Sequence, residues 1–286
     1  MSALHPLPPS LAPHRSVGLV GFGAFGRLIA HHLAPHAALR IHDPYLPAGT
    51  LAAHLAADAG PDAVAADLPS VAACPVVILA TPVASLAEAA RALAPHLRPG
   101  TLVVDVGSVK MGPAAILQEE LPADVEILAT HPLFGPQSAR VGAGVGARDG
   151  AGNGIRGLKV AVCPIRGRCG LRAAAFLRRV LGLDVIVTTP EAHDRAMASV
   201  QGLTHLIAKV LVAMEPLPTR MTTRSFDLLM QAVGMVRHDA PDVFHAIERA
   251  NPYAAPVRQR FFALAGQLDA ELAREAVHAE PVRLAS

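Results

Sequence analysis

A glycine-rich turn near the N-terminus has the spacing of a dinucleotide-binding site. Residues 17–26 read V-G-L-V-G-F-G-A-F-G, an apolar run that leads into a G-x-G-x-x-G turn and then a helical pattern. Gly21 would permit the tight turn, Gly23 would let the backbone approach a pyrophosphate, and Gly26 would let the helix pack close to the strand. The phosphates would bind the N-terminal amides of the helix. The cofactor contacts expected from this turn are Gly21, Phe22, Gly23, Ala24, Phe25 and Gly26.

An acidic residue follows at the distance that such a turn requires. Asp43 ends the second apolar run, about 20 residues past the glycines, where a carboxylate accepts hydrogen bonds from the adenosine ribose. A carboxylate there repels a 2′-phosphate, so the sequence predicts NAD rather than NADP as the cofactor. Arg40, which precedes the acid, argues in the opposite direction, and a simple turn cap before Pro44 is the alternative role for Asp43.

Polar clusters follow three further apolar runs, at the points where the predicted strands end. The clusters are Thr81-Pro82 after 76–80, G-S-V-K (107–110) after 102–106, and T-H-P-L-F-G-P (130–136) after 126–129. In open α/β sheets ligands bind outside the carboxyl ends of the strands. We therefore expect these clusters to face one crevice, with Thr81, Pro82 and Ser108 in contact with the cofactor.

His131 is the candidate base among the 14 histidines of the chain. It lies at a predicted strand end, is fixed by Pro132 and is expected to face the loop that carries Ser108. A histidine that titrates near neutrality and is oriented by a hydroxyl suits removal of a proton from an alcohol during hydride transfer. Ser108 by itself is also ordinary turn chemistry, because Gly-Ser commonly follows a strand.

Alternating strand and helix patterns must position these groups. Apolar, β-branched runs predict strands at 17–20, 39–42, 76–80, 102–106, 126–129, 158–162 and 185–187. Helical patterns lie between most of them, at 25–34, 85–97 and 171–181. This alternation predicts an α/β fold with a doubly wound, mostly parallel, Rossmann-type sheet.

The pattern changes at Pro190. Strand signals stop, and helical patterns follow at 191–214, 223–236, 241–250 and 252–278. Thr189 is a suitable N-cap and Pro190 a suitable first helical residue. We expect a disordered tail over 1–14, a dinucleotide-binding Rossmann domain over 15–189 and an all-helical domain over 190–286.

Composition argues against several classes of partner. The chain of 286 residues has a net charge of +2, and aromatic residues make up only 3% of it. A binder of single-stranded nucleic acid would need stacking aromatics over a basic groove, so we expect no nucleic-acid partner. Cys74, Cys163 and Cys169 are an odd number with no C-x-x-C spacing. This pattern predicts neither disulfides nor a bound metal, and it favours a reducing, cytoplasmic location.

The mean hydropathy of +0.37 raises the question of a membrane span. The longest uncharged stretch, 68–87, has about the length of a membrane-spanning helix. Pro69, Pro75 and Pro82 interrupt it, however, and residues 75–82 predict a buried strand. The proline-rich residues 1–14 have no Lys or Arg before an apolar run, so they do not resemble a secretory signal. We therefore expect no membrane partner.

Two longer motifs resemble the prephenate and arogenate dehydrogenases of tyrosine biosynthesis. They are D-V-G-S-V-K-M-G-P at 105–113 and H-P-L-F-G-P-Q-S at 131–138, a combination that is specific to this family. The predicted helix that runs from E-A-H-D (191–194) through Met197 and Gln201 to His205 is similar to the family as well. The resemblance extends over roughly residues 16–260.

The resemblance implies a Rossmann domain followed by a helical dimerisation domain, and oxidative decarboxylation of a cyclohexadienyl substrate. NAD⁺ would accept hydride from the ring carbon that bears the hydroxyl, and His131 would take the proton of that hydroxyl. Carbon dioxide would leave from the quaternary carbon as the ring becomes aromatic. Ser108 would orient His131 or the hydroxyl, and Lys110 would hold the loop or face an anion.

The same resemblance places several residues around the substrate. His205 and Gln201 would lie at its side-chain carboxylate, and Gln137 and Ser138 would be further substrate contacts. Four-residue steps from His193 to His205 put these side chains along one helical stripe. A solvated polar face would show the same spacing.

The sequence departs from the family in the second long helix of the helical domain. Many bacterial members carry an arginine there that binds the ring carboxylate, and Met235 falls at that position. S-F-D-L (225–228) is similar to the plant arogenate branch, in which an acidic residue precedes this run. Here that position is Arg224, whose guanidinium would repel the ammonium of arogenate and attract the 2-oxo acid of prephenate. Arg224 therefore favours prephenate, with an exposed helix face as the alternative.

Two other functions fit parts of the sequence. A β-hydroxy-acid dehydrogenase of the same two-domain plan would carry a lysine early in its helical domain, whereas Lys209 comes only near the end of the first helix. A non-catalytic NAD-sensing regulator would need the glycine turn and Asp43, but it has no use for Ser108, Lys110 and His131 together.

Two further segments carry expectations of their own. The glycine-rich residues 141–157, with Arg140, Arg148 and Arg156, are either a mobile segment that attracts a dianionic substrate or an insertion without that role. An apolar stripe near the C-terminus predicts a homodimer through the helical domain. Its members are Val257, Phe261, Leu264, Leu268 and Leu272.

Overall fold

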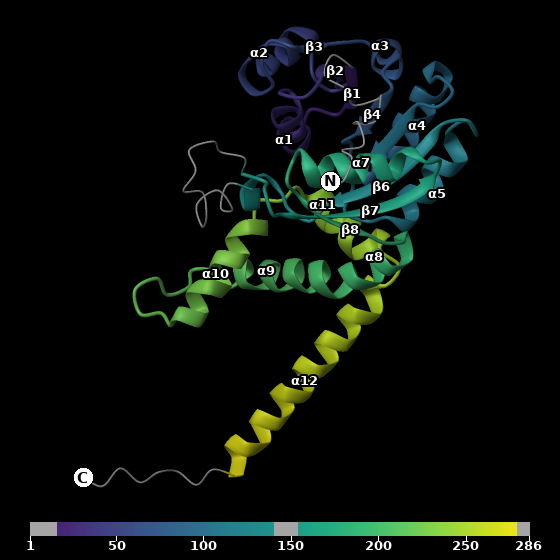
Figure 1. The fold of residues 1–286 in the computed structure, drawn as a ribbon. Coiled ribbons are helices and arrows are strands. Elements are labelled where there is room, and N and C mark those ends of the chain that lie inside the picture. Colours follow the sequence, from purple (N-terminus) through teal and green to yellow (C-terminus); the bar gives the residue numbers. More distant parts are fainter. Residues whose placement is uncertain (1–15, 140–153, 279–286) are drawn as a thin grey trace, which may run out of the picture.

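The computed structural model describes residues 16–139 and 154–278 (Figure 1). The expected tail over 1–14 and most of the glycine-rich segment, with Arg140 and Arg148, lie outside the described residues. The described chain forms an α/β body followed by a set of helices, the last of which extends away from that body (Figure 1).

One sheet of eight strands is the centre of the α/β body. Its order is β3-β2-β1-β4-β5-β6-β7-β8. The strands are β1 (Ser16–Val20), β2 (Ala38–His42), β3 (Ala63–Ala65), β4 (Val76–Leu79), β5 (Leu102–Asp105), β6 (Glu126–Pro132), β7 (Lys159–Arg166) and β8 (Asp184–Val187). All neighbours are parallel except β6 and β7. The order reverses between β1 and β4, which is where ligands bind in doubly wound sheets. The expected fold class is confirmed.

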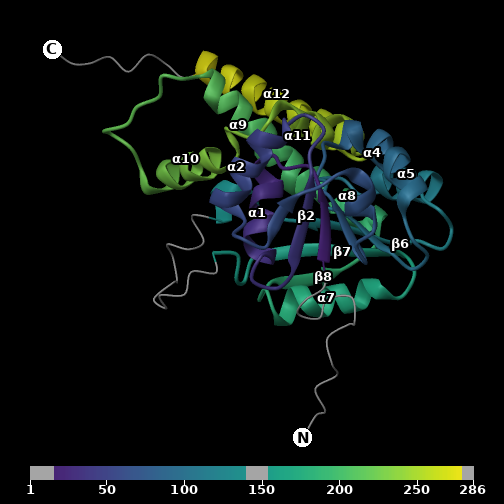
Figure 2. The ribbon, with the colours of Figure 1, turned by 90° about the horizontal axis from the view of Figure 1, so that it is seen from above.

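Helices cover both faces of this sheet (Figure 2). One apolar cluster joins the sheet to α1 (Ala24–Leu33), α2 (Ala48–Asp58) and α7 (Cys169–Arg179). A second cluster joins the other face to α3 (Leu68–Ala72), α4 (Leu86–Leu93) and α5 (Met111–Glu120). Short 3₁₀ turns, η2 (Val83–Ser85) and η3 (Ala94–His96), flank α4.

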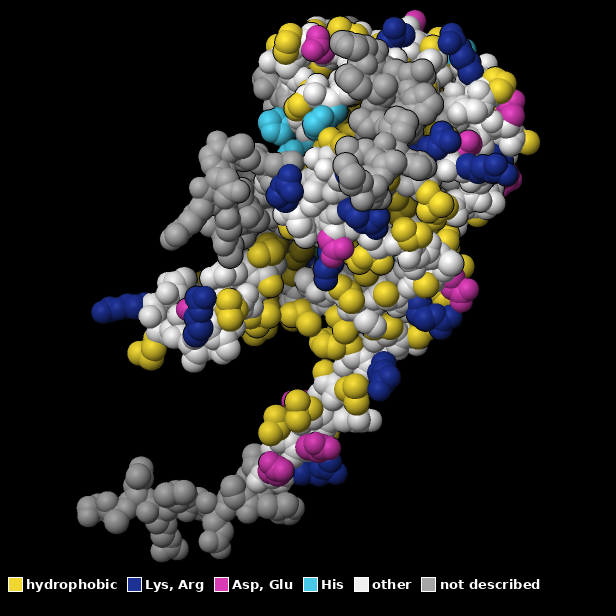
Figure 3. All heavy atoms as spheres, in the orientation of Figure 1, with side chains coloured by type: hydrophobic (Ala, Val, Ile, Leu, Met, Phe, Trp, Pro, Cys, Tyr) yellow, Lys and Arg dark blue, Asp and Glu magenta, His cyan; other side chains and the backbone are white. Residues whose placement is uncertain are grey.

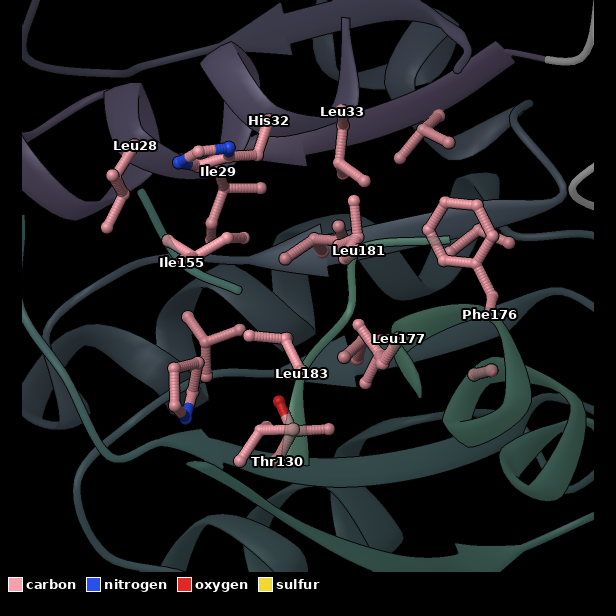
Figure 4. Close-up of a pocket in the computed structure, with 18 of the residues that line it drawn as sticks. Leu28, Ile29, His32, Leu33, Thr130, Ile155, Phe176, Leu177, Leu181 and Leu183 are labelled. Carbon is pink, nitrogen blue, oxygen red and sulfur yellow. The ribbon is translucent and has the colours of Figure 1, made fainter. Parts of the chain in front are cut away.

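An apolar cavity of about 130 Å³ lies between α1, the sheet and α7 (Figure 4). Leu28, Leu177 and Leu183 are among the side chains that line it, so we interpret it as a packing gap between the layers. Thr130 and Pro132 of β6 also line it. Successive side chains of a strand point to opposite faces, so His131 points away from this cavity, toward the face that α5 covers.

The uncharged stretch 68–87 is divided among three elements. It forms α3, then β4, then η2, so it is not a membrane-spanning helix. By length and composition alone, the helical run Pro190–Ala213 is long and apolar enough to cross a membrane, and 28% of its most apolar window is buried. This run also carries the buried side chains of His193, Asp194 and His205, which belong to the site described below.

The helices that follow the sheet begin at Pro190. Thr189 caps α8 (Pro190–Met197) by accepting a hydrogen bond from the Ala192 amide. A π-helical turn, η4 (Ala198–Gly202), joins α8 to α9 (Leu203–Ala213). The remaining elements are α10 (Arg224–Val236), α11 (Pro241–His245), a second π-helical turn η5 (Ala246–Ala250) and α12 (Ala254–His278). Single π-helical turns inside α-helices are frequent at functional sites.

Candidate active site

The glycine turn has the geometry that a bound pyrophosphate requires. Gly21 has a φ of +96°, and a Cβ there would lie 2.6 Å from the Ala80 carbonyl oxygen. A Cβ on Gly26 would overlap the carbonyl oxygen of Gly21. A Cβ on Gly23, in contrast, would meet no atom within 4 Å, so the backbone there faces open space. The first and third glycines therefore shape the turn, and the second leaves room for a ligand.

Asp43 ties the end of β2 to this turn. Its Oδ2 accepts a hydrogen bond from the Phe22 amide (2.7 Å), and its Oδ1 accepts one from the Tyr45 amide (2.9 Å). It therefore caps the turn after β2, as the alternative interpretation held, and also lies against the glycine turn. Arg40 donates to the Ser70 carbonyl (3.3 Å), at α3. The placement of Asp43 fits a ribose site, and the guanidinium of Arg40 is already used within the protein.

Three buried side-chain atoms lack a hydrogen-bond partner within the described chain. They are Thr81 Oγ1, Gln137 Oε1 and Gln201 Oε1. Buried polar atoms are nearly always bonded, so each of these atoms can accept a further partner, either a ligand or a water molecule. All three belong to residues that the sequence assigned to cofactor or substrate. Thr81 follows β4 at the switch point, so its free hydroxyl oxygen also fits a bound dinucleotide.

A chain of three buried side chains crosses from the sheet to the helical domain. His131 Nδ1 lies 2.9 Å from His193 Nε2, and His193 Nδ1 lies 2.7 Å from Asp194 Oδ1. The Asp194 carboxylate also accepts hydrogen bonds from the backbone amides of Lys110 (2.7 Å) and Met111 (2.9 Å). These contacts join the loop after β5, the end of β6 and the first turns of α8.

This chain determines which nitrogen of His131 is free. The ionised Asp194 can only accept, so His193 carries its proton on Nδ1 and presents an unprotonated Nε2. His131 must then donate through Nδ1, and its own Nε2 is left with a lone pair. The two rings are nearly perpendicular with centroids 5.0 Å apart. The geometry therefore holds His131 in the tautomer that can accept a proton.

The surroundings of His131 also keep it neutral. Burial, followed by the neighbouring His193, Lys110 and His205, holds the pKa of His131 well below its ordinary value. Desolvation disfavours the charged imidazolium, and the nearby Lys110 ammonium disfavours it further. The base form of His131 is consequently the populated one at neutral pH.

Lys110 lies behind the site. Its ammonium is fully buried, pairs with Asp105 and donates to the Thr130 carbonyl (2.6 Å). Asp105 also accepts from the Gly107 amide (2.9 Å), so the ion pair fixes the loop 107–110, which connects β5 to α5. Of the two roles expected for Lys110, the structure shows the loop-holding one. The expectation of direct contact with the substrate is corrected, because no part of this side chain is exposed.

Other predicted contacts fall on the loops around His131. Ser108 is half-buried in the loop that Lys110 holds. His193, rather than Ser108, is the residue that orients the His131 ring, so a contact of Ser108 with the substrate hydroxyl or the cofactor stays a prediction. Ser138 Oγ accepts from the Gly135 amide (2.8 Å) and donates to the Gly135 carbonyl (3.2 Å), which uses its hydroxyl within its own turn. Gln137 retains its unpaired oxygen.

His205 lies between two acceptors. Its Nδ1 is 3.0 Å from the Gln201 carbonyl oxygen, and its Nε2 is 3.0 Å from Asp239 Oδ2. A carbonyl oxygen and a carboxylate both accept only, so both ring nitrogens of His205 face acceptors within the protein. The contact of His205 with the substrate carboxylate stays a prediction.

Arg224 is not part of this cluster within one protomer. It is exposed at the first residue of α10, whereas Asp239 follows the last turn of the same helix and contacts His205. The intervening helix spans about 18 Å along its axis. The expectation that Arg224 binds the substrate beside His205 is therefore wrong for the single protomer, and the interpretation as an exposed helix face is the one that the structure shows.

The sequence did not single out several residues that complete the site. They are Asp105, Thr130, His193, Asp194, Asp239 and Asn251, whose side-chain amide donates to the Asp194 carbonyl (2.8 Å). His193 and Asp194 stood within the E-A-H-D motif, which was the available signal. Asp105 and Thr130 stood within the quoted motifs at 105–113 and 130–136, whereas Asp239 and Asn251 carried no motif, because their partners are distant in the sequence.

Two models of one protein family match the chain. "Prephenate dehydrogenase, nucleotide-binding domain" matches residues 49–148, and "Prephenate dehydrogenase, dimerization domain" matches residues 189–280. The chain belongs to the prephenate/arogenate dehydrogenase family. The first match begins after the glycine turn and Asp43, so the cofactor residues of the turn rest on the sequence motif and the geometry above.

Curated relatives of this family member differ in the substrate that their names specify. "Arogenate dehydrogenase 1, chloroplastic" of Arabidopsis thaliana is 27% identical over 89% of this chain and 39% of its own length. "4-amino-4-deoxyprephenate dehydrogenase" of Streptomyces pristinaespiralis is 28% identical over 86% of this chain and 80% of its own. The chain spans half or less of the length of three arogenate or arogenate/prephenate dehydrogenases that it matches, the Arabidopsis protein named above among them.

Solved structures share the fold of this family member. The Synechocystis arogenate dehydrogenase has a TM-score of 0.65 at 19% identity, over 91% of this chain and 93% of that one. The prephenate dehydrogenase from A. aeolicus, in complex with hydroxyphenyl propionate and NAD⁺, has a TM-score of 0.69 at 21% identity, over 92% of both chains. At these identities the likeness shows the common architecture.

Proposed function

We propose that the protein oxidatively decarboxylates a cyclohexadienyl acid of the prephenate or arogenate type, with NAD⁺ as the hydride acceptor. The observation that carries this proposal is the free Nε2 of His131, which His193 and Asp194 hold in the accepting tautomer. It lies at the same edge of the sheet as the glycine turn, in a chain that belongs to this family.

Each group in the site has a defined task in this reaction. The turn of Gly21 to Gly26 would hold the pyrophosphate, Asp43 the ribose, and Thr81 Oγ1 would bond the bound dinucleotide. Bound NAD⁺ supplies the hydride acceptor. His131 Nε2 takes the proton of the ring hydroxyl, and the charge it gains is balanced by Asp194 through His193. Loss of carbon dioxide makes the ring aromatic, so the protein needs orientation and one base.

The two competing functions receive less support. Lys209, which a β-hydroxy-acid dehydrogenase would use, is exposed on α9 and lies over the Phe244 ring at 5.7 Å. A nicotinamide sensor would have no use for a buried histidine pair that leaves one nitrogen free. The preference for prephenate inferred from Arg224 loses its basis, because Arg224 lies at the far end of α10 from His205.

We also propose a cytoplasmic homodimer. The family model that covers 189–280 is a dimerization domain, and the helical domain exposes apolar side chains along α9 and α12 (Figure 3). Val210 of α9 is 45% exposed and Leu268 of α12 is 57% exposed. Burying such a surface against a second copy would be favourable, at about 25 cal/mol per Å². The three cysteines are free thiols, which supports the reducing location expected from their number.

The decisive experiment measures NADH or NADPH production with prephenate and with arogenate, each with NAD⁺ and NADP⁺. We expect turnover with NAD⁺ and at least one of the two acids. His131→Asn should retain NAD binding and lose about 10²- to 10⁴-fold in kcat. Absence of turnover with every pair, or an unaffected His131→Asn variant, would refute the proposed function.

A further inference from the structure

We propose that Asp239 and Gln201 bind the ammonium group of the substrate, so that the preferred substrate is a cyclohexadienyl amino acid of the arogenate type rather than the 2-oxo acid. This inference rests on the proposed function and specifies its substrate. It reverses the preference that Arg224 suggested.

The first argument is that Asp239 has one carboxylate oxygen available for a further hydrogen bond. One carboxylate oxygen of this residue bonds His205 Nε2 at 3.0 Å. The side chain is 29% exposed, and its Oδ1 has no hydrogen-bond partner within the described residues. A carboxylate in this position can accept a further charged donor without losing its contact with His205.

The second argument is the buried oxygen of Gln201. Its Oε1 has no partner within the described chain, although Gln201 lies one turn before His205 and its backbone carbonyl bonds that ring. The two residues that bond the His205 ring, Asp239 and Gln201, thus each keep one side-chain oxygen without a partner in the described chain. An ammonium supplies three N–H donors, whereas a 2-oxo group supplies none.

The third argument is the distribution of positive charge. Arg237 follows α10 two residues before Asp239, but Glu215 holds its guanidinium through both carboxylate oxygens at 3.0 Å each. Arg224 lies at the other end of α10. Neither of these guanidinium groups is thus available to Asp239, and the sequence assigns the carboxylate that both candidate substrates carry to His205. An ammonium at Asp239 Oδ1, beside that carboxylate, would match the α-amino acid end of arogenate.

The energetic consequence follows from the charges. An ammonium would form charge-assisted hydrogen bonds with Asp239, whereas a 2-oxo acid would place its carbonyl oxygen against a carboxylate. Hydrogen bonds to charged groups correspond to about a 10- to 100-fold difference in affinity. We expect the wild-type protein to favour arogenate over prephenate by at least about 10-fold in kcat/KM.

The test compares kcat/KM for arogenate and prephenate, with saturating NAD⁺, in the wild type and in Asp239→Asn. We expect the replacement to lower kcat/KM for arogenate about 10- to 100-fold more than kcat/KM for prephenate, mainly through KM, because any disturbance of His205 affects both substrates alike. Asp242→Asn is the matched control, because Asp242 is exposed at the start of α11, three residues further on. Gln201→Met, which keeps the length of the side chain but removes the acceptor, should also weaken arogenate selectively.

Two outcomes would overturn the inference. A wild type that prefers prephenate would do so directly. A parallel loss with both substrates in Asp239→Asn would show that Asp239 only orients His205. Both outcomes leave the proposed function intact, because turnover is still observed, whereas a wild type that oxidises neither acid refutes the proposed function itself. If Asp239→Asn does not fold, the selectivity of Gln201→Met decides.

Discussion

Replacing Asp194 by Asn tests the proposed tautomer of His131 directly. Asp194 accepts three hydrogen bonds, from His193 Nδ1 and from the amides of Lys110 and Met111, at 2.7, 2.7 and 2.9 Å. An asparagine keeps one acceptor oxygen and introduces an NH₂ group. His193 Nδ1 and the Lys110 amide bond the same oxygen, Oδ1, so an asparagine that keeps its oxygen there preserves the tautomer but loses the negative charge. If the NH₂ group faces His193 instead, His193 must accept through Nδ1 and carry its proton on Nε2. His131 then accepts through Nδ1, and its proton moves to Nε2, the atom that should act as the base.

The size of the effect follows from this reversal. Loss of general-base catalysis, or the wrong tautomer in a comparable histidine–carboxylate pair, lowers kcat by about 10²- to 10⁴-fold. Wherever the new NH₂ group faces a backbone amide, that buried amide loses its acceptor, which costs about 1–3 kcal/mol of unfolding free energy. We therefore expect Asp194→Asn to lose about 10³-fold in kcat, with stability reduced by about 2 kcal/mol and affinity for NAD⁺ unchanged.

The assay is steady-state NADH production at saturating substrate and NAD⁺, together with thermal unfolding and NAD⁺ titration of the same preparation. Glu191→Gln is the control, because Glu191 lies on the same helix but is exposed, and its pairing with Arg195 is a surface contact of small energy. A folded Asp194→Asn variant with kcat within threefold of the wild type would refute the argument that the Asp194 carboxylate supports His131 as the base.

Further predictions concern the cofactor turn, the pH dependence and the helical surface. Gly23→Ala should fold normally but weaken NAD⁺ binding at least tenfold, because its Cβ would point into the space for the ligand. Gly26→Ala should lower the unfolding temperature, because its Cβ would overlap the backbone of Gly21. Equal unfolding temperatures for the two variants would contradict this expectation. Because the pKa of His131 is depressed in the folded state, the unfolded chain binds more protons at this residue than the folded chain does below about pH 6.5. The His131 contribution to stability is present above that pH and is lost as the pH falls further. The kcat/KM that depends on His131 should persist below pH 6.5, and an acid limb centred at or above 6.5 would be inconsistent with a buried base. Leu268→Glu should convert a dimer to a monomer in sedimentation; a wild type that is already monomeric at micromolar concentration would argue against the proposed interface.

Local patterns predicted most of the sheet, for a physical reason. Strands buried on both faces are uninterrupted runs of Val, Ile and Leu, so β1, β4 and β5 begin and end within one residue of their predicted bounds. The three-residue β3 carries too few residues for a pattern, and the Ala-rich α2 has no distinct apolar face. The antiparallel direction of β7 depends on the path of the connection before it, which no local pattern records.

The site was predictable only where chemistry is encoded in neighbouring residues. The glycine turn, Asp43 and His131 carry their signal in short motifs. The contact between Asp194 and the Lys110 amide joins residues 84 positions apart, and the contact between His205 and Asp239 depends on how α9 and α10 pack. Lys110 shows the same limit, because its motif identified the residue but could not show that its ammonium turns inward to Asp105.

The bridging position of Asp194 makes the two halves of the protein unequal in what each can do alone. A fragment that ended at residue 189 would keep the glycine turn and Asp43, yet nothing would choose between the two tautomers of its His131. Cofactor capture is thus a property of the first half, and basicity is a property of the assembled pair. The helices that face the substrate can then change in sequence without loss of the base. The condition is that the first turns of α8 keep His193 against His131 and Asp194 against the amides of the loop after β5.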